Sequence, residues 1–142
     1  MDPYQLSRFT DAQRHTFHHA LSELQCGEKS SHWMWFIFPQ LRHLGHSDRA
    51  VYYGISGLEE ARAYIRDPVL RDRLIQVSQT ILAHREKTAV DIFGHTDAKK
   101  LRSCMTLFRE AAPQIPVFDE VLTVFYDGKP DKHTLNILRN GN

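Results

Sequence analysis

Residues 31–41 constrain the fold of this chain more than any other segment. They contain both tryptophans, Trp33 and Trp35, within six consecutive apolar residues at 33–38. Each large aromatic side chain carries ~150–250 Å² of surface that folding must remove from water. His32 and Gln40 bracket the run, and each indole N–H needs an acceptor once it is buried. The segment is therefore predicted to be either the centre of the core or the apolar wall of a pocket with polar edges.

The size and composition are those of one soluble globular domain, which we expect to span residues 1–142. Because 18 basic and 17 acidic residues give a formal net charge of +1, no strong field favours nucleic acid or an anionic membrane. The longest apolar run is far shorter than the ~20 residues of a membrane helix, and the N-terminus lacks the pattern of a signal peptide. We expect a cytoplasmic protein in which Cys26 and Cys104 are reduced, mostly buried thiols.

Helix signals dominate the N-terminal quarter of the chain. Asp2 followed by Pro3 predicts a short helix over residues 4–9. Thr10 or Asp11 is then expected to cap a second helix. The apolar residues of this second helix and the glycine that should end it are Phe17, Ala20, Leu21, Leu24 and Gly27.

Capping residues and apolar stripes predict further helices along the rest of the chain. Ser56 and Glu59 have the spacing of a capping box, and Asp67-Pro68 predicts the end of that helix and the start of the next. A helical turn over residues 88–93 is expected to close at Gly94. The later predicted starts and stops are Thr96 or Asp97, Pro113, Pro116, Asp127-Gly128 and Asp131, and the two clearest stripes are Leu70, Leu74, Val77, Ile81 and Leu101, Cys104, Met105, Phe108, Ala112.

The run at 33–38 has strand propensity, but a lone strand would leave its backbone groups without partners. We therefore interpret it as a short helix or irregular core segment that Pro39 ends. The predicted fold is all-α, a single compact domain of about seven to nine short helices.

The aromatic run is the first candidate binding site. Trp33 and Trp35 could stack on a planar ligand while His32 or Gln40 reads its edge. The alternative is a core segment whose histidine only hydrogen-bonds a nearby carbonyl.

The helix that follows Asp97 is the second candidate. Backbone N–H groups at a helix start suit a phosphate when Lys and Arg side chains lie close by. A solvated basic face on an amphipathic helix has the same pattern, so that alternative stays open. The polar residues of this face are Lys99, Lys100, Arg102, Ser103, Thr106 and Arg109.

The sequence gives little indication of a metal site or of a catalytic nucleophile. Asp11, His15 and His19 share helical spacing, but no glutamate adjoins the first histidine and no further ligand is apparent, so neither a metal nor another cofactor is expected. The chain contains neither a G-x-S-x-G motif nor a phosphate loop. The helical stripe places Cys104 inward, which is typical of an inert thiol.

Nine strings of residues together resemble one bacterial family, the domain of unknown function 1810. This resemblance covers nearly the whole chain and implies an all-helical single domain without a settled activity. Some members carry a "calpastatin" label, but calpain inhibition is associated with disordered, repetitive chains. Because the pattern of this chain is compact and helical, we do not expect it to inhibit calpain. Cys104 stands where members tend to have serine, which also argues against a thiol mechanism. The strings are Asp2-Pro3-Tyr4, Arg8-Phe9, 31–41, Tyr53-Gly54-Ile55, 61–64, Pro68-Val69-Leu70, 100–103, 105–108 and 125–128.

The C-terminal half is also similar, at the level of pattern, to the NADAR superfamily, which includes N-glycosidases acting on ADP-ribose-type and riboflavin-pathway compounds. The likeness lies in a polar helix at 100–108 followed by a helix that ends in an aromatic residue and a turn at 118–128. It is an analogy between patterns and identifies no residue roles by itself.

These observations lead to a hypothesis of an N-glycosidase-type hydrolase acting on a nucleotide or ADP-ribose-like small molecule. The oxocarbenium-like state of such a reaction needs a carboxylate close by. The alternatives are a non-catalytic nucleotide- or protein-binding module, and a purely structural aromatic run with any site elsewhere. In the enzyme hypothesis Asp97 or Asp127 is the carboxylate, and His32 or Gln40 assists the leaving group. Trp33 and Trp35 stack the base, Lys100 and Arg102 hold phosphate, and Ser103 is a further substrate-binding residue.

Overall fold

The computed structural model describes residues 2–140, and this part of the chain is entirely helical apart from turns and loops. It contains eight α-helices and one 3₁₀ helix, with no strand beyond an isolated bridge between Leu41 and Ile55. The predicted all-α, single-domain fold is confirmed. The helices are α1 (Ser7–Gln25), α2 (Met34–Ile37), η1 (Arg42–Leu44), α3 (Asp48–Tyr52), α4 (Leu58–Arg66), α5 (Pro68–Leu82), α6 (Ala89–Ala111), α7 (Val117–Tyr126) and α8 (Lys132–Arg139).

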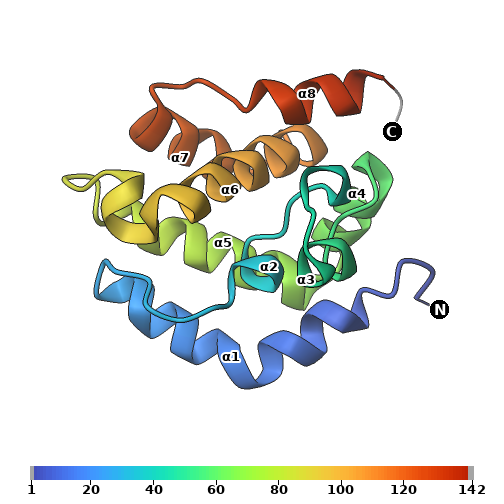
Figure 1. The fold of residues 1–142 in the computed structure, drawn as a ribbon, viewed down its shortest axis with the longest axis horizontal. Helices are drawn as coiled ribbons and strands as arrows, with labels where there is room; N and C mark the ends of the chain where they lie inside the picture. Colours follow the sequence, from blue (N-terminus) through green and yellow to red (C-terminus); the bar gives the residue numbers. More distant parts are fainter. Residues whose placement is uncertain (1, 141–142) are drawn as a thin grey trace.

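The helices stack from α1 on one side of the molecule to α8 on the other (Figure 1). Helix α5 occupies the middle and packs against α1, α4 and α7, while α6 packs against α4, α7 and α8. The short helix α2 packs against α1, and α3 lies beside α2 (Figure 1). Within residues 2–140, none of the helices combines the length and apolar character needed to cross a bilayer.

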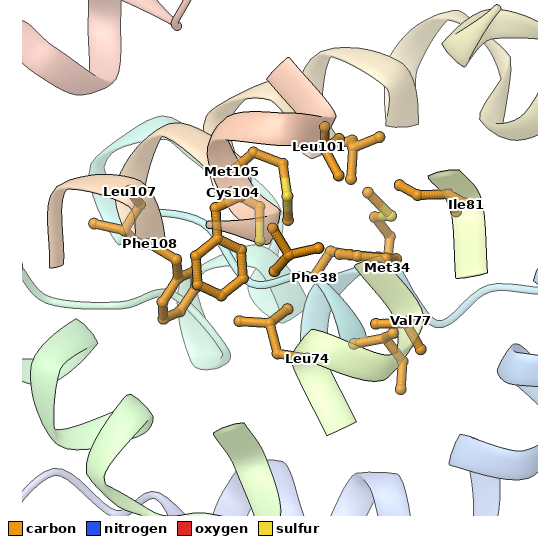
Figure 2. Close-up of a cluster of buried hydrophobic side chains, with 14 of the residues drawn as sticks. Met34, Phe38, Leu74, Val77, Ile81, Leu101, Cys104, Met105, Leu107 and Phe108 are labelled. Atoms are coloured by element: carbon orange, nitrogen blue, oxygen red, sulfur yellow. The ribbon is translucent and has the colours of Figure 1, made fainter. Parts of the chain in front are cut away.

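The aromatic run forms a short helix that enters the core, as predicted. Helix α2 ends just before Phe38 and Pro39. Figure 2 shows Met34 and Phe38 lying among side chains of α5 and α6. The stripes predicted for these two helices are buried, because they supply the opposite walls of this cluster: Leu74, Val77 and Ile81 from α5, and Leu101, Cys104, Met105 and Phe108 from α6.

The predicted break between two N-terminal helices is wrong, because α1 runs without interruption from Ser7 to Gln25. The Thr10 hydroxyl donates to the Ser7 carbonyl instead of capping a new helix. Phe9 and Gln13 are both buried, so the inward face continues across the predicted boundary. The carboxylate of Asp2 does accept from the N–H groups of Leu6 and Ser7, and Gly27, with φ 78°, follows the end of the helix as expected.

Two further boundaries differ from the prediction. Gly94 itself closes the first segment of α6 as predicted, because its φ of 80° and ψ of 167° are non-helical and kink the helix. Helical geometry resumes directly after the kink, so Thr96 and Asp97 lie in the first turn of the second segment instead of capping it. The Ser56–Glu59 capping box does not form, because Glu60 accepts from the Ser56 N–H at 2.8 Å.

A buried arginine fixes the loop that carries α3. The Arg8 guanidinium pairs with Glu60 at 2.7 Å and donates to the carbonyls of Tyr52 and Gly54. Gly54 passes so close to the backbone of Arg42 that an added Cβ would lie 2.4 Å from the Arg42 Cα, which excludes any larger residue without movement. Together these contacts hold α3 beside the exposed edge of α2.

Candidate functional site

A pocket of about 370 Å³ lies where the loop after α1, the helix α2 and the kink of α6 meet. Its size is within the usual range for small-molecule sites, ~300–1,000 Å³. The lining combines an apolar wall with two lysines, two histidines and a carboxylate. The residues are Lys29, His32, Met34, Trp35, Phe93, Gly94, His95, Thr96, Asp97 and Lys100.

Asp97 lies between two lysines at the edge of this pocket. Its Oδ2 is 2.8 Å from the Lys29 Nζ, and its Oδ1 is 3.7 Å from the Lys100 Nζ. Asp97 is the third residue after the Gly94 kink, where a negative charge interacts favourably with the N–H groups of the first helical turn. The carboxylate is therefore held in one orientation from two sides.

The Lys29 side chain is nearly buried and is held in position by several contacts. Its side chain is only 7% exposed, and besides Asp97 its ammonium donates to the Ser31 carbonyl at 2.6 Å. The same nitrogen lies 5.0 Å from the centre of the Trp33 ring, and the Lys29 N–H donates to the Ile92 carbonyl. These contacts fasten the loop after α1 to the first segment of α6.

Trp35 forms the aromatic wall of the pocket and is partly exposed. The Lys100 Nζ lies 5.7 Å from its ring centre, and the Arg49 guanidinium of α3 lies 5.1 Å from it. A smaller cavity of about 10 Å³ adjoins the same ring and includes Gln40 and Tyr53. Gln40 therefore lies next to Trp35 and Lys100 without lining the larger pocket.

Trp33 does not share this wall, because its side chain has no exposed surface. It is the residue before α2, and its indole N–H donates to Glu23 Oε1 at 3.0 Å inside the core. Residues two apart in a helical segment point to different sides, so Trp33 and Trp35 diverge. Of the two tryptophans proposed to stack a ligand, only Trp35 reaches the pocket.

Glu23 organises the buried side of the segment 30–33. Its Oε1 accepts from the N–H groups of Ser30 and Ser31 as well as from Trp33. Burial disfavours the charged carboxylate, but the hydrogen bonds from these residues prevail and lower the pKa of Glu23 to about 2. Its Oε2 makes no well-directed hydrogen bond, although the His19 Nε2 lies 2.9 Å away.

Three predicted site residues lie away from the pocket. Arg102 donates from Nε to the Lys129 carbonyl and lines a different cavity beside α8. The Ser103 hydroxyl is buried and donates to the Lys99 carbonyl. Asp127 is exposed at the C-terminal end of α7, with a left-handed φ of 56°, and lies outside the residues that line the pocket. Of the predicted site residues, the pocket lining brings together His32, Trp35, Asp97 and Lys100.

Lys29, Phe93 and His95 were missed by reasoning from the sequence. Lys29 carries no local signal, since its partner Asp97 is far along the chain. Gly94 and Asp97 were both recognised as helix-boundary signals, and His95 lies between them. The predicted helix boundary at 94–97 was therefore an indirect signal for His95, but not for Lys29 or Phe93.

The hypothetical metal ligands on α1 make other contacts. His19 faces Glu23 and lies 3.1 Å from the Ser31 hydroxyl. Among residues 2–140, no three His, Cys, Asp or Glu side chains gather closely enough to hold a metal ion. Cys26 is exposed at the end of α1, so the expectation that both thiols are buried is wrong for Cys26 and correct for Cys104.

The fold and the pocket define an all-helical, single-domain protein with a polar cleft beside a tryptophan. The chain belongs to the family described as "Protein of unknown function (DUF1810)", which matches residues 3–138. Its structure is similar to that of the conserved hypothetical protein Rv1873 from Mycobacterium tuberculosis, with a TM-score of 0.95 and 42% identity over 97% of this chain and 99% of that chain. No curated protein matches the chain. The resemblance to the domain of unknown function 1810 is thereby confirmed.

Proposed function

We propose that this pocket binds a nucleotide or ADP-ribose-like small molecule and hydrolyses its N-glycosidic bond. The observation that carries the proposal is the position of Asp97, a carboxylate fixed by two lysines at the edge of a pocket that also contains the Trp35 ring and His32. A planar base stacks on an indole, and a fixed carboxylate stabilises positive charge that develops on the sugar.

Four residues of the pocket have defined roles in this proposal. The base lies against Trp35, and Lys100, the more exposed of the two lysines, pairs with a phosphate group. Asp97 takes a proton from the attacking water while the bond between the base and the anomeric carbon breaks. The new bond joins the water oxygen to that carbon, and His32 supplies a proton to the departing base.

A non-catalytic binding module is the second candidate, and the same ion pair favours it. Both carboxylate oxygens of Asp97 already face a lysine, which is typical of a structural ion pair. Such a module would use Trp35 and Lys100 for recognition and leave its ligand unchanged. The two candidates therefore share a binding site and differ in whether a product appears.

The first experiment is a thermal-shift screen against nucleotides, ADP-ribose, NAD and nucleosides. A ligand at a hundredfold its dissociation constant stabilises a protein by ~2.7 kcal/mol, which shifts the Tm of a domain of this size by several degrees. Trp35→Leu should abolish the shift. Tyr52→Leu is the matched control, since Tyr52 is 58% exposed and does not line the pocket. A panel without any shift contradicts the proposal, as does a shift that Trp35→Leu leaves intact.

A further inference from the structure

A second cavity, of about 730 Å³, lies between α6, the loop 129–131 and α8, away from the residues that line the Trp35 pocket. Helix α8 runs along the outer side of α6 in this region (Figure 1). The cavity collects four basic side chains, Arg102, Lys129, Lys132 and Arg139, and a single carboxylate, Asp131. With histidine neutral, the lining carries a net charge of +3, although the whole chain carries only +1.

Buried hydrogen bonds hold the loop that lines this cavity in place. The Thr106 hydroxyl, on α6, donates to the Arg102 carbonyl and accepts from the Asp131 N–H at 2.9 Å. Asp131 Oδ2 in turn accepts from the N–H and the hydroxyl of Thr134. Because Thr106 and Thr134 have no exposed surface, this chain of bonds ties the loop to both helices. The cavity therefore exists before any ligand arrives.

The basic side chains that line this cavity are available to bind an anion from solution. Arg102 uses its Nε to donate to the Lys129 carbonyl and lies 5.7 Å from the centre of the Tyr126 ring, which leaves its two Nη groups for other acceptors. None of the salt bridges within residues 2–140 involves Arg102, Lys129 or Lys132. The one carboxylate of the lining is occupied in capping α8. Like charges gathered without counter-charges favour a bound anion.

We propose that this cavity is a phosphate-binding site for a small phosphorylated molecule. Arg102 offers a fork of donors that matches phosphate oxygens, and Lys129 and Lys132 add charge from the loop and from the first residue of α8. Pro130 and Leu135 supply an apolar wall for the organic part of the ligand. The inference is independent of the Trp35 pocket, since the two linings share no residue.

Calorimetric titration with inorganic pyrophosphate tests the proposal. We expect saturable binding to the wild type, and a loss of roughly tenfold or more in affinity in Lys129→Ala/Lys132→Ala, since hydrogen bonds to charged groups are the strong ones. Both lysines are exposed, so the variant should fold normally. The matched control is Arg66→Ala/Lys99→Ala, which removes the same charge from exposed positions outside the cavity.

The outcomes of this titration distinguish a specific site from a nonspecific effect of charge. Equal weakening in the lysine variant and in its control means that pyrophosphate responds only to net charge and overturns the proposal. Absence of binding to the wild type also overturns it. Lys100→Ala, in the other pocket, should bind pyrophosphate at this site as tightly as the wild type. A loss of binding in that variant would assign the phosphate to the Trp35 pocket instead.

Discussion

Lys29 and Asp97 form a nearly buried ion pair, with 2.8 Å between Nζ and Oδ2, that joins the loop after α1 to the segment of α6 beyond its kink. The side chains are only 7% and 19% exposed. The pair thus fixes both the backbone that leads into α2 and the carboxylate that faces the pocket. Structure and proposed chemistry depend on the same contact.

Removal of one partner should destabilise the protein strongly. Asp97→Ala leaves the Lys29 ammonium buried with only the Ser31 carbonyl as a hydrogen-bond acceptor, and we expect a loss of about 3 kcal/mol in the free energy of unfolding. Lys29→Met/Asp97→Ala should recover part of this loss, because no charge is then left unpaired. Urea unfolding of the wild type, the two single variants Lys29→Met and Asp97→Ala, and the double variant measures the coupling free energy between the two side chains. Additive effects would show that the pair is not coupled in solution.

Acid should weaken the fold partly through Glu23. The folded-state pKa of this carboxyl is lowered from 4.5 to about 2, so its stabilising contribution is complete above pH 4.5 and is lost as the pH falls toward 2. We expect this contribution to be about 2–3 kcal/mol. This is somewhat below the free energy equivalent to the whole pKa shift, because solvent near the site screens the interactions.

Glu23→Gln isolates that contribution from the other carboxyl groups. The difference in unfolding free energy between wild type and Glu23→Gln should be largest near neutral pH and should shrink between pH 4.5 and 2. A difference that stays constant across this range would show that the carboxyl group has an ordinary pKa in the folded state.

Substitution of the two tryptophans should reduce stability to very different extents. Trp33→Ala opens the core and removes one of the three hydrogen-bond donors to Glu23, and such truncations cost ~3–5 kcal/mol. Trp35→Leu, at a partly exposed position, should cost about 1 kcal/mol or less. Denaturant unfolding of both variants makes the comparison. Equal losses of stability would mean that Trp35 is a core residue and not the wall of an accessible pocket.

The two cysteines should differ in reactivity. Burial raises the pKa of the Cys104 thiol well above its usual value and shields it from reagents, whereas Cys26 is exposed. A chromogenic disulfide reagent should therefore modify one thiol in the native protein and both after unfolding. Cys26→Ser should abolish the native-state reaction. Rapid reaction of both thiols in the folded wild type would contradict the burial of Cys104.

Local signals in the sequence predicted much of the fold because they act over a few residues. Asp67 caps α5 ahead of Pro68, and the helix carries its stripe inward as expected. Gly94 was recognised as a break and Pro39 as the end of the aromatic segment. The break proposed at Thr10 failed because a capping residue type is only a local preference, and packing of the continuous α1 face overrides it.

The candidate site was less predictable because it depends on contacts between distant residues. Lys29 meets Asp97 across many intervening residues, and nothing near either residue in sequence indicates the other. Arg102 and Lys100 lie on one helix and were grouped together, yet they line different cavities because residues two apart point to different sides of a helix. The same rule separates Trp33 from Trp35.

A time course of base release tests whether Asp97 catalyses hydrolysis of an N-glycosidic bond in the Trp35 pocket. Wild type and Asp97→Asn are incubated with the compound that gives the largest thermal shift, and free base is quantified by chromatography. Circular dichroism confirms that the variant is folded, and the ligand-induced thermal shift confirms that it still binds. We expect free base with the wild type and a loss of at least about a hundredfold in rate with Asp97→Asn. Release that Asp97→Asn leaves unchanged would contradict the catalytic role of Asp97, and a wild type that binds the compound without consuming it would contradict hydrolysis in this pocket.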